Sequence, residues 1–448
     1  MEVIAPPARR VLERLERAGY EAYLVGGCVR DLLLDRRPGD WDITTAARPE
    51  EVLSLFAPQA AATGLKHGTV TVFEGAASFE VTTFRLDGTY ADHRHPDAVT
   101  FSDSLAEDLK RRDFTVNAIA MDQAGEITDL FGGREDLARG VLRCVGRPEQ
   151  RLEEDALRIM RALRFSSVLG FSLAPETADA VFQGKSLLRE VAVERVREEL
   201  LKLLCGRCVV PALLQYAEVL GVVLPEILPA VGCDQRNIHH CYDVWEHIAR
   251  TVGFVPPDAV LRMTMLLHDL GKPGTMTVDE DGTGHFRGHA DVSCTLGKTI
   301  LERLRFDKES TRRILTLVQW HDVPIEQTQK AMRRLLHKLG EQGVRDLLQV
   351  KRADNLAQAS AYHGRQGQID TLEALLQQAL EQDACFTLRQ LAVNGRDLLE
   401  QGYRGREVGA ALQFMPVSYT HLGCHSRRLY SGKRDRKHRR RRVLVPGV

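Results

Sequence analysis

The first part of the chain alternates short β-branched runs with amphipathic segments. Residues 7–18 have apolar side chains at helical spacing, and residues 20–25 form a short apolar run that stops at Gly26-Gly27. Residues 69–73 and 78–84 alternate apolar and polar positions, which is typical of half-buried strands. The pattern further predicts helices at 28–34 and 49–56 and strands at 41–45 and 116–121. We therefore expect a small α+β domain over residues 1–145.

Beyond Gly146 the strand pattern stops and apolar residues recur at helical spacing. Helices are predicted over the following ranges: 151–169, 174–182, 193–204, 242–252 and 260–270. Residues 275–286 are rich in Gly and Asp and predict a hairpin or loop. We expect a helical neck at 146–205, a helical body at 206–360, a helical tail at 361–415 and a separate basic segment at 416–448.

Charge is unevenly distributed along the chain. Sixty-one Lys and Arg balance sixty-one Asp and Glu, so the formal net charge is zero. Residues 425–442 contribute ten Lys or Arg and one Asp, so this segment carries +9 and the rest carries −9. Any nucleic-acid contact of the acidic body must therefore come from local basic clusters. The basic segment is interpreted either as a non-native end that interrupts a packing helix or as an arm for RNA.

The Gly26-Gly27 pair follows a predicted strand and opens a predicted helix. Glycines at such a turn let backbone N–H groups approach a phosphate, and the helix start favours the anion. Arg30, one turn into the helix, can add a bidentate phosphate contact. A tight turn without a ligand is the alternative interpretation.

Asp40 and Asp42 flank Trp41 at the start of the second predicted strand. Alternation places both carboxylates on one side of the strand, where they suit Mg²⁺, a cation that prefers oxygen ligands and shares them with phosphates. Two-metal phosphoryl or nucleotidyl transfer needs a third carboxylate, for which Glu80 on a neighbouring predicted strand is the candidate. A solvated turn and an exposed strand glutamate are the alternatives.

Several longer motifs accompany these residues. They are Leu24-Val-Gly-Gly-Cys-Val-Arg-Asp31, Gly39-Asp-Trp-Asp-Ile-Thr44, Arg111-Arg-Asp-Phe-Thr-Val-Asn-Ala118, Gly125-Glu-Ile-Thr-Asp-Leu130 and the run at 87–96. Together they resemble the head of the class II CCA-adding enzymes and bacterial poly(A) polymerases, which are polymerase-β-like nucleotidyltransferases. The resemblance covers roughly residues 12–414 and implies an α+β head followed by an all-α neck, body and tail. It implies phosphate binding by Gly27, Arg30 and Arg112.

The first neck helix is predicted to carry Asp155, Arg158, Arg161 and Arg164, each three residues apart and hence beside the next. A carboxylate beside a guanidinium offers an acceptor and donors to the Watson–Crick edge of cytosine or adenine. A charged helix face with internal ion pairs is the alternative. The stretch resembles the family's Glu-Asp-x-x-Arg element, which implies base selection by Asp155 and Arg158. Arg161 and Arg164 would then contact phosphates of the nucleotide or of the tRNA end.

Histidine and aspartate side chains gather in the predicted body, where six of the fifteen histidines fall between residues 239 and 289. Imidazole and carboxylate together suit a divalent transition metal. Four such residues occur in an order that resembles HD phosphohydrolases: His247, His268, Asp269 and Asp354. His289 and His321 are candidate ligands of a second metal. Helix caps or ion pairs, and a purely structural HD domain, are the alternatives.

The leading hypothesis is an enzyme that adds C, C and A to the 3′ end of tRNA without a nucleic-acid template. Mg²⁺ is the expected cofactor, and tRNA, CTP and ATP are the expected partners. Alternatives are a poly(A) polymerase, a partial C-adding or A-adding enzyme, and a protein that is mainly an HD metal-dependent phosphohydrolase. No run of about 18 apolar residues is present and the first residues are charged, which predicts a cytoplasmic protein without a membrane partner.

Overall fold

The structure, a computed structural model, describes residues 4–87, 99–381, 395–400 and 402–409. It contains two compact units, one made of Met1–Asp322 with Gln349–His363 and the other of Val323–Leu348 with Gly364–Val448. Most of the motif predicted at 87–96, and all of the basic segment 416–448, lie outside the described residues.

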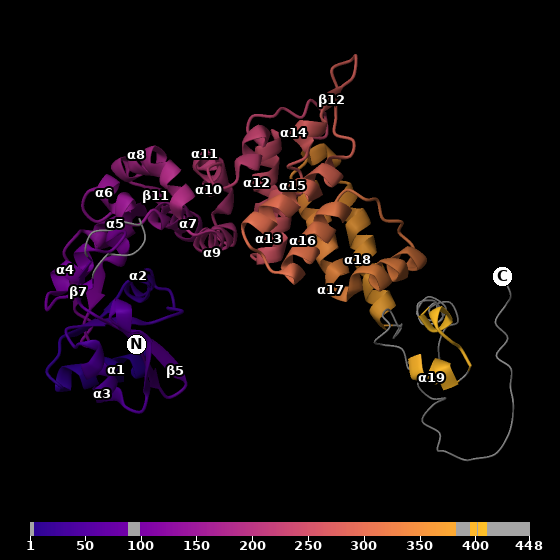
Figure 1. The fold of residues 1–448 in the computed structure, drawn as a ribbon. Helices are drawn as coiled ribbons and strands as arrows, with labels where there is room; N and C mark the ends of the chain where they lie inside the picture. The colour runs from indigo at the N-terminus through magenta and orange to yellow at the C-terminus, as the bar shows by residue number, and fades with distance from the viewer. Residues whose placement is uncertain (1–3, 88–98, 382–394, 401, 410–448) are drawn as a thin grey trace, which may run out of the picture. The chain divides into compact units, whose positions relative to one another are not determined.

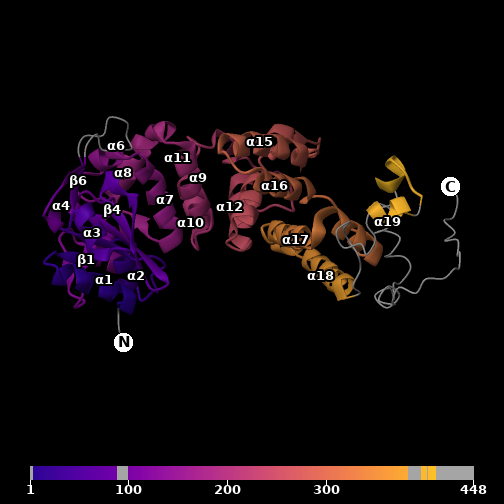
Figure 2. The ribbon, with the colours of Figure 1, turned by 60° about the horizontal axis from the view of Figure 1, so that its bottom comes forward.

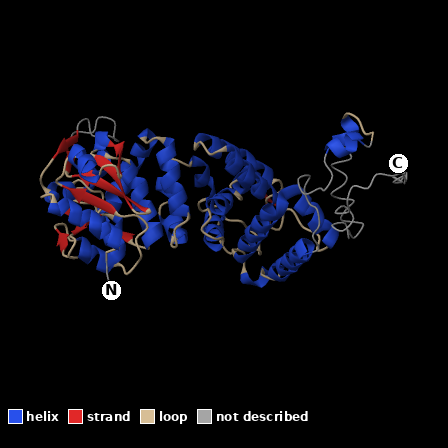
Figure 3. Cartoon of the chain, turned by 90° about the horizontal axis from the view of Figure 1, so that it is seen from below, coloured by secondary structure: helices blue, strands red, loops and turns tan. Residues whose placement is uncertain are grey.

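A seven-stranded mixed sheet forms the centre of the N-terminal part, where Figure 3 shows the strands in red. The strand order is β3-β4-β5-β2-β1-β8-β9, and every neighbouring pair is antiparallel except β2 and β5. The strands are β1 (Ala22–Val25), β2 (Asp42–Thr45), β3 (Ala60–Gly64), β4 (Thr69–Glu74), β5 (Ala77–Thr83), β8 (Ile119–Met121) and β9 (Ile127–Asp129). Alternation along β4 buries Val70 and Val72, as its sequence pattern predicts.

Five helices surround this sheet (Figure 1). They are α1 (Pro6–Arg17), α2 (Gly27–Leu33), α3 (Pro49–Phe56), α4 (Leu105–Lys110) and α5 (Gly133–Arg139). α1 packs on β1 and β4, and α3 packs on β3, β4 and β5, so the apolar face of each helix covers the sheet. Two further strands, β6 (Arg85–Asp87) and β7 (Val99–Phe101), form a separate antiparallel pair.

Helices follow the sheet domain along the chain. They are α6 (Pro148–Glu154), α7 (Leu157–Leu169), α8 (Pro175–Gly184), α9 (Val193–Leu204), α10 (Val209–Gln215) and α11 (Ala217–Leu220). α7 packs against α9 and α10. A short parallel bridge between β10 (Val141–Leu142) and β11 (Ser172–Leu173) links the end of the head to the helical neck.

The body that follows contains α12 (Val244–Phe254), α13 (Ala259–Leu267), α14 (Lys272–Thr275), α15 (His289–Arg303) and α16 (Lys308–Trp320). α15 and α16 lie side by side, as Figures 1 and 2 show. Strands β12 (Thr277–Val278) and β13 (Gly284–His285) form the hairpin predicted at 275–286. The long helix α17 (Gln329–Leu356) is interrupted at Gly340, which has a positive φ of 72°. The second unit also contains α18 (Arg365–Glu381) and α19 (Gly395–Glu400).

The prediction of a mixed head followed by helices is confirmed. The strand predicted at 116–121 is shorter than expected, because Thr115–Asn117 form a 3₁₀ turn and only Ile119–Met121 are extended. Strand β3 was not predicted, since the run Ala60-Ala61-Ala62 has no β-type alternation. Among the described residues, no helix is both long enough and apolar enough to cross a membrane.

Candidate functional site

The turn from β1 into α2 lines a cavity in the head. Gly26 has φ 73° and ψ −131°, a conformation that residues with a β-carbon rarely adopt. A β-carbon on Gly26 would also lie 3.2 Å from Nη1 of Arg112 and 3.7 Å from Oδ2 of Asp42. Gly27 is the first residue of α2. The predicted strand, glycine turn and helix are therefore confirmed, and the glycine brings the backbone close to two charged side chains.

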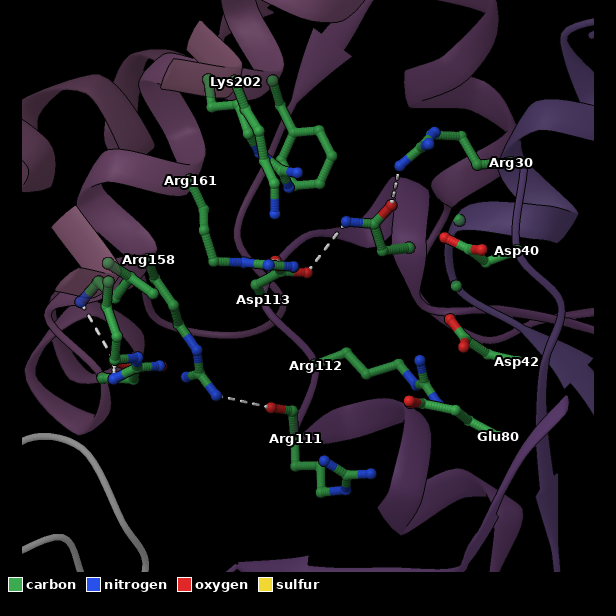
Figure 4. Close-up of a pocket in the computed structure, with 18 of the residues that line it drawn as sticks. Arg30, Asp40, Asp42, Glu80, Arg111, Arg112, Asp113, Arg158, Arg161 and Lys202 are labelled. Atoms are coloured by element: carbon green, nitrogen blue, oxygen red, sulfur yellow. Dashed lines mark hydrogen bonds and ion pairs between the residues drawn. The ribbon is translucent and has the colours of Figure 1, made fainter. Parts of the chain in front are cut away.

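Three carboxylates, those of Asp40, Asp42 and Glu80, lie on one side of the cavity (Figure 4). Asp42 pairs with Glu80 in the parallel register of β2 and β5, which places both side chains on the same face of the sheet. Burial raises the pKa of the Asp42 carboxyl; Arg112 opposes the shift, and Glu80 and Asp40 add to it. Carboxylate oxygens are the ligands that a hard divalent cation such as Mg²⁺ prefers, although these three are not among the described groups whose ligand atoms all lie within 4.8 Å of one another.

Arg112 is held beside these carboxylates by Asp108. The Asp108 side chain is fully buried, and its Oδ2 accepts hydrogen bonds from Nη2 of Arg112 and from Oγ1 of Thr44, both at 3.1 Å. Its Oδ1 accepts one from Nε of Arg111 at 2.9 Å. Burial favours the neutral acid, but Arg112 and Arg111 outweigh it and lower the pKa of Asp108. An ionised, buried carboxylate thus fixes a cation next to Asp42.

Asp113 connects α2 to α7. Its Oδ1 accepts hydrogen bonds from Nδ2 of Asn117 (3.1 Å) and from the N–H of Phe114 (2.8 Å), and its Oδ2 accepts one from Nε of Arg161 (2.7 Å). Arg30 donates to Oδ1 of Asn117 at 2.8 Å, as Figure 4 shows. Although burial opposes ionisation, Arg161 and Asn117 hold the pKa of Asp113 well below its usual value. Arg30 and Arg161, two of the predicted phosphate-binding arginines, therefore belong to one hydrogen-bond network around Asp113.

Three of the arginines lie around the ring of Phe165. The guanidinium carbons of Arg30, Arg161 and Arg164 lie 5.3, 5.4 and 3.9 Å from the centre of its ring. Arg164 also pairs with Glu199 at 2.8 Å. Burial and the neighbouring Arg161 lower the pKa of Arg164 to about 10, so a phosphate would relieve an unfavourable concentration of positive charge.

The unbroken helix predicted through Asp155 is wrong. α6 ends at Glu154 and α7 begins at Leu157, because Asp155 has extended backbone angles (φ −138°, ψ 100°). Its Oδ1 accepts a hydrogen bond from the N–H of Leu157 at 3.1 Å, which satisfies a free donor at the helix start. Asp155 pairs with Arg195 at 3.2 Å and not with Arg158, contrary to the prediction that the two lie side by side on one helix.

Arg158 is engaged by other groups. It pairs with Glu154 at 2.9 Å and donates to the carbonyls of Arg151 (2.9 Å) and Arg111 (3.0 Å). These acceptors fix the direction of its guanidinium independently of Asp155.

All ten head and neck residues predicted as site residues line one cavity of about 780 Å³. They are Gly27, Arg30, Asp40, Asp42, Glu80, Arg112, Asp155, Arg158, Arg161 and Arg164. Nine Arg or Lys side chains and five carboxylates line the cavity, giving a formal charge of +4. The carboxylates Asp40, Asp42 and Glu80 face Arg158, Arg161 and Lys202 across it (Figure 4). The size and charge suit a nucleoside triphosphate.

Sequence reasoning missed several lining residues, among them His67, Arg111, Asp113, Asn117, Phe165, Arg195 and Lys202. Asp113 and Asn117 stand in a motif that was recognised, so their polar character was an available signal. Arg195 and Lys202 lie on α9, far from the other site residues in sequence, and no local pattern marks them.

The body holds a second cluster. His247, His268, Asp269 and Asp354 bring one ligand atom each to within 4.8 Å of the others, which is close enough for a shared metal ion. Nε2 of His247 lies 3.2 Å from Oδ2 of Asp269 and 3.0 Å from Oδ1 of Asp354. The four side chains come from α12, the end of α13 and α17, so residues spread over more than a hundred positions meet at one point.

A second group shares Asp269 with His289 and His321. Oδ1 of Asp269 lies 3.3 Å from Nε2 of His289 and 3.6 Å from Nε2 of His321, while its Oδ2 faces the first group. The two oxygens of one carboxylate therefore face two different sets of imidazoles.

Three buried atoms of this cluster make no well-aligned hydrogen bond, namely Nε2 of His268 and both oxygens of Asp269, although Oδ2 of Asp269 lies in ion-pair distance of neighbouring side chains. Buried polar atoms without well-aligned hydrogen bonds are unfavourable, so the convergence of these ligand atoms fits a bound cation. Lys272, which sequence reasoning did not select, lies 2.6 Å from Oδ2 of Asp269 and donates to Gln235 at 2.9 Å. These residues could thus hold one or two divalent metal ions.

Three family models match the chain. The poly A polymerase head domain matches residues 22–143, the probable RNA- and SrmB-binding site of polymerase A matches residues 170–230, and the HD domain matches residues 237–359.

Curated relatives and solved structures agree with these matches. The chain is 57% identical over 199 residues to the CCA-adding enzyme of Lactobacillus helveticus, covering 44% of the chain and 50% of the relative. It is 53% identical over 216 residues to the CCA-adding enzyme of Geobacillus stearothermophilus, covering 48% of the chain and 53% of the relative. The chain thus spans about half the length of the curated relatives it matches. The crystal structure of the Bacillus stearothermophilus CCA-adding enzyme in complex with CTP matches 93% of the chain and 94% of its own length, with 33% identity and a TM-score of 0.72.

Proposed function

Because the chain belongs to the family of CCA-adding enzymes, we propose that it adds C, C and A in turn to the 3′ end of tRNA. The observation that carries this proposal is the cavity in which three carboxylates lie opposite several arginine side chains. CTP and ATP would be the nucleotide substrates. The tRNA 3′-hydroxyl would attack the α-phosphate, and the bond to the leaving pyrophosphate would break. The relative solved in complex with CTP supports the choice of nucleotide.

The carboxylates on one side of the cavity would bind the metal ion, and the cations on the other side would bind phosphates. Asp40, Asp42 and Glu80 would hold Mg²⁺, which when bound supplies positive charge at the triphosphate and lowers the pKa of the attacking hydroxyl. Arg112, fixed by buried Asp108, remains next to these carboxylates. It would limit their mutual repulsion and contact a phosphate oxygen.

The remaining cations would bind the triphosphate and the tRNA end. Gly27 offers its backbone N–H at the start of α2, and Arg30, Arg161 and Arg164 surround Phe165. Fixed guanidinium groups bind phosphate without reorganising, which favours the transition state. The sequence predicts a cytoplasmic location, and tRNA is expected in the same compartment.

Base selection would depend on Asp155 and Arg158. The Asp155 carboxylate can accept a hydrogen bond from N4 of cytosine or N6 of adenine, and Arg158 can donate to ring nitrogens or to O2 of cytosine. Because Arg158 pairs with Glu154 and Asp155 pairs with Arg195, each side chain can face the base from its own direction.

The direct test uses tRNA that lacks its last three nucleotides. CTP alone should give two additions, and CTP with ATP should give three. Extension of arbitrary RNA by ATP alone would identify a poly(A) polymerase instead, and addition of only C or only A would identify a partial enzyme. Asp42→Asn should abolish addition without loss of the fold, whereas Asp103→Asn, which changes a carboxylate that is 82% exposed, should not.

A second activity is proposed for the cluster around Asp269, because ligand atoms of four histidine and aspartate side chains converge there in a buried site. A divalent transition metal held by His247, His268, Asp269 and Asp354 would activate water for phosphate-ester hydrolysis. Hydrolysis of p-nitrophenyl phosphate should then persist in Asp42→Asn and disappear in His268→Ala. The content of transition metal should fall only in His268→Ala, because Asp42 is proposed to bind Mg²⁺. If hydrolysis and metal content are both unchanged in His268→Ala, the cluster is purely structural.

A further inference from the structure

We propose that Arg195 is a positioning residue that sets base selectivity through Asp155. The inference rests on the proposed nucleotide addition and adds a residue from a different helix to its specificity. Arg195 lies on α9, whereas Asp155 lies in the break between α6 and α7. Both side chains line the cavity.

Arg195 and Asp155 form a bidentate contact, here called the fork. Nη1 of Arg195 lies 3.4 Å from Oδ1 of Asp155, and Nη2 lies 3.2 Å from Oδ2. A two-point contact of this kind fixes the plane of a carboxylate, which a single hydrogen bond cannot do. The side chains remain 29% and 17% exposed, so a ligand in the cavity can reach the pair.

The fork orients Asp155 without saturating it. Charge-assisted hydrogen bonds are usually about 2.7–2.9 Å long, and the neighbouring pairs Arg158–Glu154 and Arg161–Asp113 are 2.9 and 2.7 Å. Both Arg195 contacts are longer than these. Each carboxylate oxygen can accept more than one hydrogen bond, so Asp155 keeps acceptor capacity for a base.

An oriented carboxylate distinguishes bases by the group at their Watson–Crick edge. Cytosine and adenine present amino groups that donate to Asp155, whereas uracil has, where cytosine carries its amino group, a carbonyl oxygen that the carboxylate repels. Without Arg195, the Asp155 carboxylate would keep the hydrogen bond from the Leu157 N–H, which contacts only one of its two oxygens. The carboxylate could then rotate away from the base, and the discrimination would decrease.

Arg158 does not provide this orientation. Its guanidinium contacts Glu154 and the carbonyls of Arg151 and Arg111. A substitution of Arg195 should therefore change selectivity through Asp155 and leave the arrangement of Arg158 intact.

The test compares CTP with UTP. Arg195→Gln should lower the ratio of kcat/KM for CTP to that for UTP by about tenfold, within the range expected for one two-point base contact. Arg195→Lys, which keeps the charge but loses the fork, should give a smaller decrease. The matched control is Arg197→Gln on the same helix, because Arg197 donates to the Leu304 carbonyl at 3.4 Å and does not belong to the cavity lining. This control should retain the wild-type ratio.

A double-mutant cycle separates positioning from general stabilisation. In an Asp155→Asn background, Arg195→Gln should no longer change the CTP/UTP ratio, because the residue through which it acts is already altered. An additive effect in that background would overturn the inference, as would an unchanged ratio in folded Arg195→Gln. If Arg195→Gln fails to fold, Arg195→Lys carries the same comparison.

Nucleotide binding, measured by calorimetry with CTP and with UTP, distinguishes this inference from the proposed function. If the wild-type chain binds CTP selectively but does not extend tRNA, the proposed function fails while the binding ratio still tests Arg195. Equal selectivity in wild type and Arg195→Gln refutes the inference alone. Absence of selectivity in the wild type refutes it as well.

Discussion

The substitution Asp113→Asn is expected to destabilise the protein strongly, although the two side chains have nearly the same size and shape. Asp113 is 7% exposed and accepts hydrogen bonds from Asn117, Arg161 and the N–H of Phe114. Asparagine keeps the shape but replaces one acceptor oxygen with a donor. That donor would face Nε of Arg161 or the amide of Asn117, and the Arg161 charge would lose its partner.

The cost can be estimated from these contacts. Removing one partner of a buried ion pair usually costs about 3–5 kcal/mol. Arg161 remains 33% exposed, so water can compensate in part, and we expect about 3 kcal/mol. At about 2–4 °C per kcal/mol for a domain of this size, the melting temperature of the head should fall by about 6–12 °C. The control Asp103→Asn breaks an exposed pair with Arg48 and should cost less than about 1 kcal/mol.

Urea unfolding at several pH values provides the assay. The pKa of Asp113 is lower in the folded protein than its usual value of about 3.9, so its contribution is fully present above that value. The contribution is lost as the pH falls through 3.9 towards the folded pKa. The difference in stability between wild type and Asp113→Asn should therefore be constant from pH 7 to 5 and should shrink below pH 4. If Asp113→Asn costs no more than Asp103→Asn, or the difference grows in acid, the reasoning is refuted.

Three further predictions concern the two sites. Gly26→Ala should reduce nucleotide addition and stability, because φ is 73° and the new β-carbon would lie 3.2 Å from Nη1 of Arg112; thermal melting and the tRNA assay would show both. Glu154→Gln should loosen the contacts that fix Arg158 and raise KM for CTP several-fold; because Glu154 also pairs with Arg151, the melting temperature should fall too, and an unchanged KM would contradict the prediction. His321→Ala removes a ligand from the second metal group only, so metal content measured by mass spectrometry should fall without vanishing, and tRNA extension should be unaffected.

Local sequence patterns were sufficient to predict the elements that carry the head site. The glycine pair marks the turn before α2, and the alternation in β2 and β5 places Asp42 and Glu80 on one face. The order of histidines and aspartates likewise predicted a cluster whose members converge in space. The domain limits proposed at 145, 205, 360 and 415 stay predictions.

Contacts between distant residues account for what the sequence could not reveal. The helical pattern continues through Asp155, but there its side chain accepts a hydrogen bond from the first N–H of α7 and pairs with Arg195, forty positions later. The importance of Asp113 likewise depends on Arg161, which is 48 positions away. Lys272 follows the ligand pair closely in sequence, yet only the fold shows that it contacts Asp269. Helix propensity contains no information about such partners.

The parallel register of β2 and β5 has a consequence for how this chain can change during evolution. Because side chains alternate along a strand, inserting or deleting one residue between Glu80 and Thr83 would turn Glu80 to the opposite face of the sheet while the backbone pairing survived. The same change in the turn at Gly75 would leave the register of β5 with β2 intact. Homologous sequences should therefore tolerate length variation at the tip of this hairpin and exclude it within the four residues that pair β5 with β2.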